Sequence, residues 1–424
     1  MGPALLWSNP LFTQASEHIL GDEVEFYDLP SQEVGHYSLD RQWVVQTTRP
    51  YGETPTMEWI GLIFRYGSSV WDAGRMLGEV NLREMIRDAP LSPSVPKILS
   101  SLGLTGLAQE WAAETLSHRH ISDAYVEELI APQVERGPNL RIPKMNGLAM
   151  IMAAAQEDSA SKHAGGDFVE RMGRVAQSLR GVDIRTDSKV TGIKRIQLDG
   201  DREAWLVQNE GFGHAEIEAF DQVIVAAPGL EQQRLIDNPI RDSATAYSDG
   251  GEGDGDDSDD DDDDDVGVEE AVDFDPVYVT FFTTSEPLRR PIPGADEAWI
   301  PPQVLFMDSK RGTHEVAYVR GVVRHRDDGS SDVEHLYRYV TEENMEDILS
   351  ADPAVTWVYH RRLDYAYPLT YPRTQYPSFR LGDGLWTTGA IHSIGSTVDL
   401  SWLAGKIVAR EVINTMSKNK FHEV

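Results

Sequence analysis

The chain has 424 residues, of which 40% are hydrophobic and 25% charged, so it can bury the core of two or three domains. It contains no cysteine, which excludes disulfides, thiolate catalysis and metal sites with cysteine ligands. The formal net charge of −32 is concentrated, because residues 249–270 hold fourteen acidic residues and no basic one. Without that run the net charge is −18, and no basic cluster is dense enough to predict a nucleic-acid partner.

The N-terminal part of the chain is predicted to contain a strand followed by helices. The stretch RQWVVQTT, Arg41–Thr48, has the pattern of a strand. Helical patterns follow at Met76–Arg87, Gly106–Leu116, Ser122–Ile130 and Leu148–Ala155. Ser122 is a plausible N-cap, and Pro132 is expected just beyond the end of its helix.

The pattern changes after about residue 160. A helix is predicted at Gly165–Gly181 and a short strand at Val182–Thr186. A hairpin is predicted from Lys189–Leu198 and Ala204–Asn209, followed by a buried strand at Asp221–Gly229. This order is typical of a chain that returns to a dinucleotide-binding sheet after an insertion, although many α/β proteins share it.

The acidic run at 249–270 is predicted to be a disordered surface insertion. Its charges lie closer together than the Debye length of about 8 Å, so they repel, and the run has few apolar residues to bury. A calcium site is the alternative, but an EF-hand loop needs Gly and Glu at set positions. Strands of a second, antiparallel sheet are expected afterwards at Asp275–Thr284, Gln303–Met307 and Glu315–Val323.

The C-terminal stretch GLWTTGAIHSIGSTVDLSWLAGKIVA, Gly384–Ala409, reads as a strand, a glycine-rich turn and a helix. The start of a helix has free N–H groups and a partial positive charge, and Gly389 and Gly395 would let a ligand approach the backbone. Hydroxyls are available at Thr387, Thr388, Ser396 and Thr397. The stretch suits an anion or a polarised carbonyl such as flavin O2, or Ser396 and Thr397 simply cap a helix.

These segments together resemble the prenylcysteine oxidase family, also called prenylcysteine lyase, a branch of the FAD-dependent oxidoreductases related to flavin amine oxidases. The resemblance rests on GGD…VDIRTDSKVTGI…DQVIVAAP, on YAYPLTYP and the C-terminal stretch, and upstream on IFRYGSS and AYVEELIAPQVERGPNLRIPKMNGLAMIMAAA. It runs roughly from Trp43 to the C-terminus. Where the family has Ser-x-Met-Glu at the helix start, this chain has Ser396-Thr397-Val398-Asp399.

The resemblance implies an α/β fold with α+β elements, that of a two-domain FAD-dependent oxidoreductase of amine-oxidase type. The implied reaction, part of prenylated-protein catabolism, is oxidative cleavage of the prenylcysteine thioether by dioxygen to cysteine, a prenyl aldehyde and hydrogen peroxide. It needs a dry apolar pocket beside the flavin and no protein nucleophile. The family also suggests a lysosomal, vacuolar or secretory route, whereas MGPALLWSNPLF is a poor signal peptide. The compartment and the oligomeric state therefore stay open.

The resemblance also implies roles for particular residues. Val190 would bind adenine through its backbone. The ribityl chain and the isoalloxazine of FAD would lie along Thr388, Gly389, Ser396, Thr397, Val398 and Asp399. The flavin face or the prenyl cavity would be lined by Arg65, Tyr66, Tyr365 and Tyr367. For the tyrosines among them, packing in the core is the alternative. The catalytic side chains are not assigned, and no metal site or transmembrane helix is expected.

The expected organisation departs from the family in one respect. No strand–GxGxxG–helix unit precedes Trp43, so the dinucleotide-binding domain is expected to be incomplete and Val223–Ala226 to expose an apolar edge. The expected parts are an N-terminal remnant (1–56), a helical region (57–160), an FAD-binding segment (161–230), the acidic insertion (245–272), a substrate-domain sheet (273–363) and a second FAD-binding segment (364–424). Three hypotheses follow: a family enzyme with an incomplete sequence, a related flavoenzyme for another apolar substrate, or a non-catalytic remnant that acts through its acidic segment.

Overall fold

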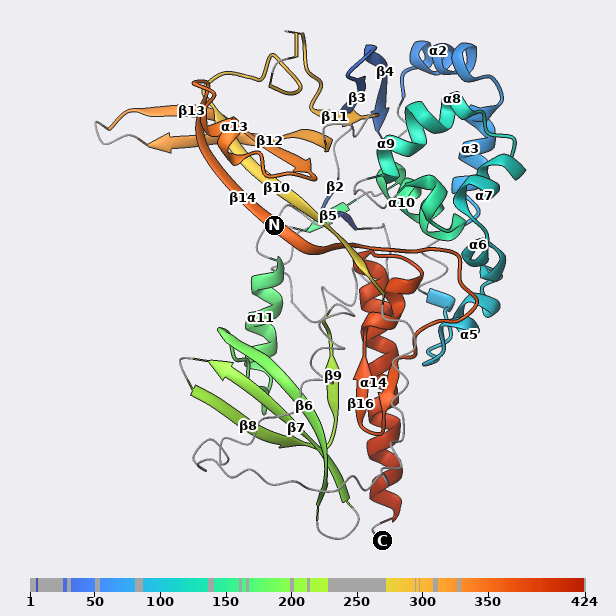
Figure 1. Ribbon diagram of the computed structural model, residues 1–424, viewed down its shortest axis with the longest axis vertical. Helices are drawn as coiled ribbons and strands as arrows, with labels where there is room; N and C mark the ends of the chain where they lie inside the picture. Colours follow the sequence, from blue (N-terminus) through green and yellow to red (C-terminus); the bar gives the residue numbers. More distant parts are fainter. Residues whose placement is uncertain are drawn as a thin grey trace, which may run out of the picture.

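The computed structural model is a mixed α/β protein (Figure 1). It describes residues 5–6, 26–28, 32–49, 54–80, 87–135, 141–159, 162–164, 168–198, 202–211, 214–227, 272–293, 295–296, 298–307, 312–325 and 329–422. The acidic run at 249–270 lies outside the described residues, so its disorder stays a prediction, as do the domain boundaries. In Figure 1 a large sheet and a group of helices share the upper part, and a long helix with smaller sheets forms the lower part.

The largest sheet has seven strands in the order β14-β10-β13-β12-β11-β3-β4. The strands are β3 (Gln32–Ser38), β4 (Gln42–Arg49), β10 (Phe274–Thr284), β11 (Gln303–Phe306), β12 (Thr313–His325), β13 (Ser331–Thr341) and β14 (Val355–Pro368). The strands predicted at Arg41–Thr48 and in the second sheet are therefore confirmed. All neighbours pair antiparallel except β11 and β3, which are parallel. That parallel pairing joins the N-terminal hairpin to the sheet, which local patterns did not indicate.

Short helices form the group beside this sheet. They are α2 (Thr56–Tyr66), α3 (Ser69–Leu77), α5 (Val95–Ser101), α6 (Thr105–Gln109), α7 (Ala112–His118), α8 (Asp123–Tyr125), the π-helix η3 (Val126–Ile130), α9 (Ala131–Val134), the 3-10 turn η4 (Ile142–Lys144) and α10 (Gly147–Ser159). The helix predicted at Leu148–Ala155 is confirmed within α10. Ser122 is confirmed as an N-cap, because its hydroxyl accepts a hydrogen bond from the backbone N–H of Tyr125.

Three predicted helices differ from the structure. The helix expected at Met76–Arg87 does not run on, because α3 ends at Leu77 and Gly78 follows it. The helix expected at Gly106–Leu116 is broken at Glu110, which is extended, and Trp111 starts α7 by donating its N–H to Glu114. Pro132 lies inside α9, which continues directly from η3, and so it does not end the helix.

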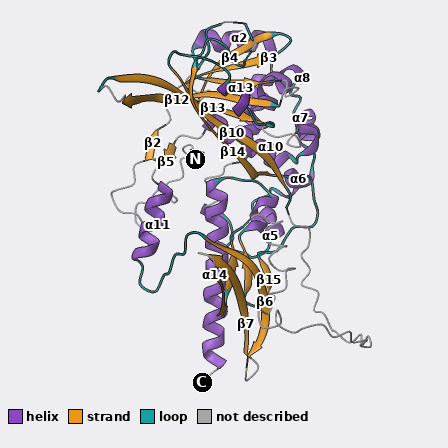
Figure 2. Cartoon of the chain, turned by 60° about the vertical axis from the view of Figure 1, so that its left-hand side comes forward, coloured by secondary structure: helices purple, strands orange, loops and turns teal. Residues whose placement is uncertain are grey.

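The lower part of the molecule contains two further sheets and the long helix α14 (Val398–His422). One sheet is antiparallel, with β6 (Ser188–Leu198), β7 (Arg202–Gly211) and β8 (His214–Phe220), and it confirms the predicted hairpin. The other has the order β15-β16-β9, with β15 (Arg380–Gly382), β16 (Leu385–Thr387) and β9 (Val223–Val225). Figures 1 and 2 both place α14 beside these strands.

Three smaller features complete this region. Helix α11 (Phe168–Ser178) lies within the helix predicted at Gly165–Gly181. Gly181, shortly after the end of α11, has a φ of 81°. The strand expected at Val182–Thr186 is wrong, since these residues are exposed and form no strand. A small sheet has the order β1-β5-β2, with β1 (Leu5–Leu6), β5 (Lys162–Ala164) and β2 (Phe26–Asp28).

Strand β9 tests the expectation that Val223–Ala226 lacks a sheet neighbour. It has one, because Val223, Ile224 and Val225 pair in parallel with β16. Among the described strands β9 nevertheless lies at the edge of its sheet, and the side chain of Ile224 is 47% exposed. The neighbour was therefore missed, and the apolar edge is confirmed.

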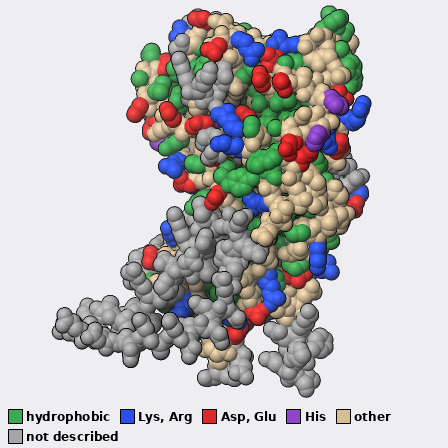
Figure 3. Space-filling model, turned by 45° about the vertical axis from the view of Figure 1, so that its right-hand side comes forward, with side chains coloured by type: hydrophobic (Ala, Val, Ile, Leu, Met, Phe, Trp, Pro, Cys, Tyr) green, Lys and Arg blue, Asp and Glu red, His purple; other side chains and the backbone are tan. Residues whose placement is uncertain are grey.

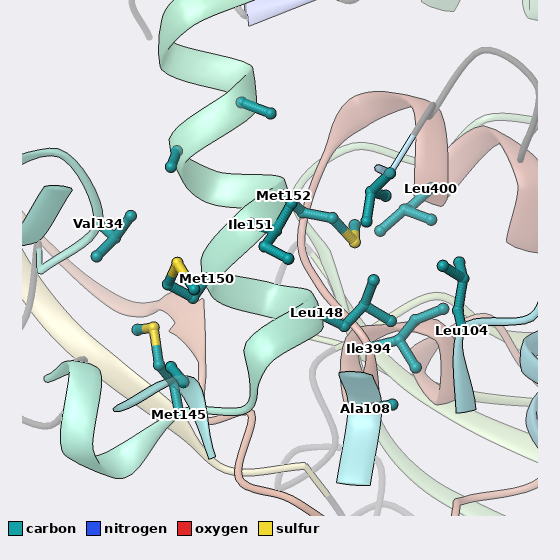
Figure 4. Close-up of a cluster of buried hydrophobic side chains, with 14 of the residues drawn as sticks. Leu104, Ala108, Val134, Met145, Leu148, Met150, Ile151, Met152, Ile394 and Leu400 are labelled. Carbon is teal, nitrogen blue, oxygen red and sulfur yellow. The ribbon is translucent and has the colours of Figure 1, made fainter. Parts of the chain in front are cut away.

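Helix α10 connects the helical group to the C-terminal segment. One buried cluster contains residues of α10 together with residues of α14 and of the turn before it. Figure 4 shows Met152 pointing toward Leu400 and Leu148 pointing toward Ile394. Most of the apolar run in α10 is buried, and the half-buried positions are the small residues Ala149 and Ala153, which explains why its pattern reads as a core helix without a polar face. This cluster fixes the position of the C-terminal turn.

The described surface mixes both signs of charge. Figure 3 shows acidic and basic side chains interspersed on one face of the molecule. No helix among the described residues is long and apolar enough to cross a membrane. The same residues contain no group of three or more His, Asp or Glu side chains placed to hold a metal ion.

Candidate functional site

The C-terminal turn begins where two parallel strands end. After β16, Thr388 donates its N–H to the carbonyl oxygen of Val225 at the end of β9, at 3.1 Å. The 3-10 turn η7 (Gly389–Ser393) follows and leads into α14. The carboxyl ends of parallel strands are where ligands bind in open α/β sheets. The predicted strand–turn–helix therefore exists and lies at a position suited to a ligand.

The start of α14 is capped by the chain itself. The hydroxyl of Thr397 accepts a hydrogen bond from the N–H of Leu400 at 3.1 Å, and the carbonyl oxygen of Thr397 accepts one from Ser401. Thr397 is therefore an N-cap, which was the alternative interpretation of this residue. Asp399 is fully buried in the first turn, where a carboxylate is favoured by the helix dipole. Ser396 is exposed and Val398 is half-buried.

The two glycines of the turn do not both leave the backbone open. A Cβ atom on Gly395 would lie 2.7 Å from Cε of Met152 and 3.2 Å from Cδ1 of Leu400. Core side chains fill the side of Gly395 where a Cβ would stand, so the absence of a side chain there serves the packing against α10, and a ligand approach to this backbone stays a prediction. Gly389 is buried, and its N–H donates to the hydroxyl of Thr387 at 2.8 Å. The hydroxyls of Thr387 and Thr397 thus serve the turn itself.

An aromatic cluster lies against the turn. The ring of His392 packs edge-on against Phe274, with centroids 5.4 Å apart, and Phe274 packs edge-on against Tyr365 at 5.9 Å. Nδ1 of His392 is covered and has no hydrogen-bond partner among the described residues. Burial lowers the pKa of His392, so the imidazole is held neutral near pH 7. Tyr367, on the same strand as Tyr365, packs against the main core cluster.

Sequence reasoning missed His392. One signal was present, because His392 is the titratable side chain of an otherwise small and apolar turn. Its environment could not be read from the local sequence, since Phe274 lies far upstream. The structure therefore adds His392 and Phe274 to the candidate site.

Arg65 and Tyr66 belong to a different cluster, around the buried carboxylate of Glu128 in the π-helix. Arg65 Nε and the Tyr66 hydroxyl each donate to Oε2 of Glu128 at 2.8 Å, and Arg41 Nη1 donates to Oε1 at 2.8 Å. Burial alone would raise the pKa of Glu128, but these hydrogen bonds together outweigh it and hold that pKa below its ordinary value. Tyr66 belongs to the main core cluster, against which Tyr367 also packs.

Val190 lies near the same strands that carry the turn. It pairs with Asn209 of β7, and the register shifts between Val190 and Gly192. Its side chain packs against a buried cluster that includes Val225 of β9 and Leu385 of β16. The structure therefore brings Val190 close to the C-terminal strand, although the two are nearly two hundred residues apart in sequence.

Comparison with protein families identifies the C-terminal part of the chain. The prenylcysteine lyase family model matches residues 315–423, which include most of β12 and all of β13, β14, η7 and α14. The resemblance to this family is confirmed over that segment, and it includes the candidate turn. No curated protein matches the chain.

Three solved structures are similar at low identity. A protein from Pyrococcus furiosus is 12% identical over 93% of this chain and 84% of its own, with a TM-score of 0.42. The p-nitrophenol 4-monooxygenase of Pseudomonas putida is 11% identical over 59% of this chain and 54% of its own, with a TM-score of 0.27. The anhydrotetracycline hydroxylase of Streptomyces rimosus is 12% identical over 54% of this chain and 37% of its own, with a TM-score of 0.27. The chain thus spans less than two thirds of the length of the last two.

Proposed function

We propose that this chain is an FAD-dependent oxidoreductase that cleaves the thioether of prenylcysteine oxidatively. The products would be cysteine, a prenyl aldehyde and hydrogen peroxide, with dioxygen as the oxidant and water as the source of the aldehyde oxygen. One observation supports this proposal most strongly. The prenylcysteine lyase match covers the segment that builds the turn, the aromatic strand β14 and the helix α14.

The residues around the turn fit FAD in part. Nδ1 of His392 lacks a partner among the described residues, the hydroxyl of Ser396 is exposed, and the 25-residue helix α14 points its N-terminus at the turn. Together they offer hydrogen-bonding groups and a partial positive charge to the oxygen-rich edge of a flavin or to a phosphate. We propose that Ser396, Val398 and Thr388 hold the cofactor through this edge, with Gly389 and Asp399 shaping it. Thr397 would act as the helix cap.

Val190 is proposed for the adenine end of the cofactor. The register shift between Val190 and Gly192 is a β-bulge, which interrupts the regular ladder and changes the direction of backbone groups. Val190 is also packed beside β9 and β16, at whose ends the turn begins. Its backbone is therefore a reasonable partner for a flat heterocycle.

FAD, when bound, would supply the two-electron oxidation of the carbon attached to sulfur. The residues of this chain would bind the substrate and exclude water. Phe274, Tyr365 and Tyr367 offer partly buried aromatic surface for a prenyl chain. A neutral His392 can accept a hydrogen bond at Nδ1 from the water that adds to the oxidised carbon.

Arg65 and Tyr66 are proposed for the outer part of the substrate site. Their polar atoms already bind Glu128, so the carboxylate fixes their orientation. The side chain of Arg65 is still 44% exposed, which leaves part of its guanidinium for a ligand.

A related flavoenzyme that acts on another apolar substrate is the second candidate. The family match begins at residue 315, so the helical group from α2 to α10 carries no family assignment. That group supplies most of the main core, and its apolar surface does not identify a prenyl chain.

A product assay tests the proposal. Purified, FAD-loaded protein is incubated with S-farnesylcysteine, and hydrogen peroxide and farnesal are quantified, with S-methylcysteine as the matched control. We expect peroxide and aldehyde in equal amounts from the farnesyl substrate and none from the methyl analogue. A flavin-loaded protein that gives no peroxide with S-farnesylcysteine would count against the prenyl substrate and favour the second candidate.

A further inference from the structure

We propose that Arg373 and Tyr376 form a binding site for the carboxylate of the substrate's amino-acid part. Both residues lie in the loop between β14 and β15, within the segment that matches the prenylcysteine lyase family. The inference rests on the proposed function, because it assigns one end of the same substrate. It names a subsite that neither the turn nor the aromatic cluster provides.

The polar atoms of Arg373 are incompletely used. Its Nη2 donates to the carbonyl oxygen of Leu369 at 3.4 Å. Nε and Nη1 are covered and have no hydrogen-bond partner among the described residues. An arginine side chain is charged at every pH of interest, and a covered donor without an acceptor is unfavourable because it has lost its hydrogen bonds to water. Such groups are rare in folded proteins, and a ligand that brings the missing acceptors explains them.

Tyr376 adds a third donor beside Arg373. The residue is 8% exposed, and its hydroxyl is covered and has no partner among the described residues. Burial raises the pKa of this hydroxyl, while the charge of Arg373 acts in the opposite direction, so the two groups are close enough to interact. The hydroxyl therefore stays protonated and able to donate.

The guanidinium of Arg373 is held in place from one side. Its Cζ lies 5.6 Å from the centre of the Tyr371 ring, in a cation–π contact. The bond to Leu369 fixes a second point. Nε and Nη1 lie on different sides of the guanidinium, so a carboxylate bound by either one would take its second hydrogen bond from the remaining hydrogen of Nη2 or from the Tyr376 hydroxyl.

The donors lie near the proposed oxidation site. Leu369, which holds Arg373, donates its N–H to the carbonyl oxygen of Asp273 at 2.8 Å. The next residue, Phe274, packs against His392 of the turn. Two short links therefore connect Arg373 to the aromatic cluster, so an elongated substrate can place its carboxylate on Arg373 and its apolar chain along the aromatic residues.

The ligand class follows from the donors. Two charged guanidinium donors and the protonated hydroxyl of Tyr376 favour an oxygen anion such as a carboxylate. A phosphate of the cofactor offers the same chemistry, so the experiment must separate the two sources.

The test compares S-farnesylcysteine with its methyl ester, which lacks the negative charge. Binding is measured by titration calorimetry on the FAD-loaded protein under anaerobic conditions, where no turnover occurs. The variants are Arg373→Met and Tyr376→Phe. The control is Arg75→Met, which removes an arginine charge that is 77% exposed on α3. We expect the wild type to bind the acid about tenfold or more tightly than the ester, in line with a charge-assisted hydrogen bond. Arg373→Met should abolish this preference, Tyr376→Phe should reduce it, and Arg75→Met should keep it.

The other outcomes are also informative. An acid preference that survives in Arg373→Met would overturn the proposal, and so would a wild type without any preference, which indicates that ordered water satisfies these donors. Loss of bound FAD in Arg373→Met, with the acid preference intact in the remaining holoprotein, would reassign the site to a cofactor phosphate. If the wild type prefers the acid and Arg373→Met loses that preference, but no peroxide forms in air, the proposed reaction fails while the carboxylate site stands.

A measurement of the unfolding temperature distinguishes a binding role of Arg373 from a purely structural one. Arg373→Met removes two covered donors that lack acceptors and loses one long hydrogen bond to Leu369 and the contact with Tyr371, so the ligand-free variant should unfold at about the same or a higher temperature than the wild type. A structural arginine would instead lower the unfolding temperature when it is removed. A marked decrease in that temperature would contradict the assignment.

Discussion

At the scale of single residues, the site depends on polar groups that the fold covers without satisfying. His392 is the clearest case in the turn, because its ring is packed against Phe274 and its Nδ1 has no partner among the described residues. Burial favours its neutral form. A neutral imidazole beside a helix N-terminus suits a ligand that needs a hydrogen bond without an added positive charge.

The buried His392 predicts a pH dependence of stability. Its folded-state pKa lies below the ordinary value of about 6.5, so below that pH the unfolded state binds more protons than the folded state. The free energy of unfolding should therefore fall as the pH drops from about 6.5 toward the folded-state pKa, and His392 should contribute no slope above that window.

The measurement is urea denaturation between pH 5 and 8 for the wild type and His392→Gln, with His325→Gln on the exposed end of β12 as the control. His392→Gln should lose less stability in acid than the wild type, whereas His325→Gln should behave as the wild type does. Parallel curves for the wild type and His392→Gln would show that His392 is not held neutral by the fold.

At the scale of elements, the lower sheets meet at Gly384, in the turn between β15 and β16. Gly384 has a φ of 74°, and a Cβ there would lie 2.8 Å from the carbonyl oxygen of Asp221 and 3.1 Å from Nε1 of Trp205. Its carbonyl oxygen accepts the N–H of Val223, and the neighbouring carbonyl of Asp383 accepts Nε1 of Trp205. One glycine thus joins β7, β9 and β16.

Gly384→Ala should destabilise the protein by about 1–3 kcal/mol, because the positive φ and the backbone clash both oppose a side chain. The matched control is Gly61→Ala in α2, where nothing lies within 4 Å of the new Cβ. That change should stabilise the protein by about 0.5–1 kcal/mol, the difference between Gly and Ala in a helix. Urea denaturation measures both, and equal effects of the two substitutions would contradict this account of the junction.

Elements with a strong local period were predictable, and those that depend on distant partners were not. The hairpin β6–β7 and the helix α10 follow from alternation and from an apolar run. The break at Trp111 depends on tertiary contacts, since Ala112 donates its N–H to Met145 and Trp111 bridges to Asn146. Local propensity cannot reveal such contacts. The neighbour of β9 was missed for the same reason, because β16 follows 160 residues later.

In the candidate site too, local features could be predicted from the sequence, and contacts between distant residues could not. The strand–turn–helix could be read from the sequence, and so could the two interpretations of Thr397, of which the structure confirms the cap. The packing of Met152 at Gly395 and the hydrogen bonds from Arg41 and Arg65 to Glu128 join residues far apart in sequence. Side chains that bind across such separations leave no local pattern, so the sequence alone could not assign them.

At the scale of the whole molecule, the C-terminal segment contains most of the proposed flavin site. The family match covers strands of the large sheet, the turn and α14, and the main core cluster ties α14 to α10 in the helical group. The proposed cofactor edge at the turn and the tyrosines of β14 therefore belong to one segment, whereas Phe274, Arg65 and Tyr66 are contributed by earlier parts of the chain. The central claim is that this segment holds a flavin.

The visible absorption spectrum of the purified protein tests that claim most directly. We predict flavin bands after incubation with FAD and gel filtration, at close to one flavin per chain, and a loss of flavin when Ser396 and Val398 at the start of α14 are both replaced by proline. Ser401→Ala, further along the same helix, should keep the flavin. A folded protein that stays colourless after incubation with FAD would contradict the account, because the turn would then hold no flavin.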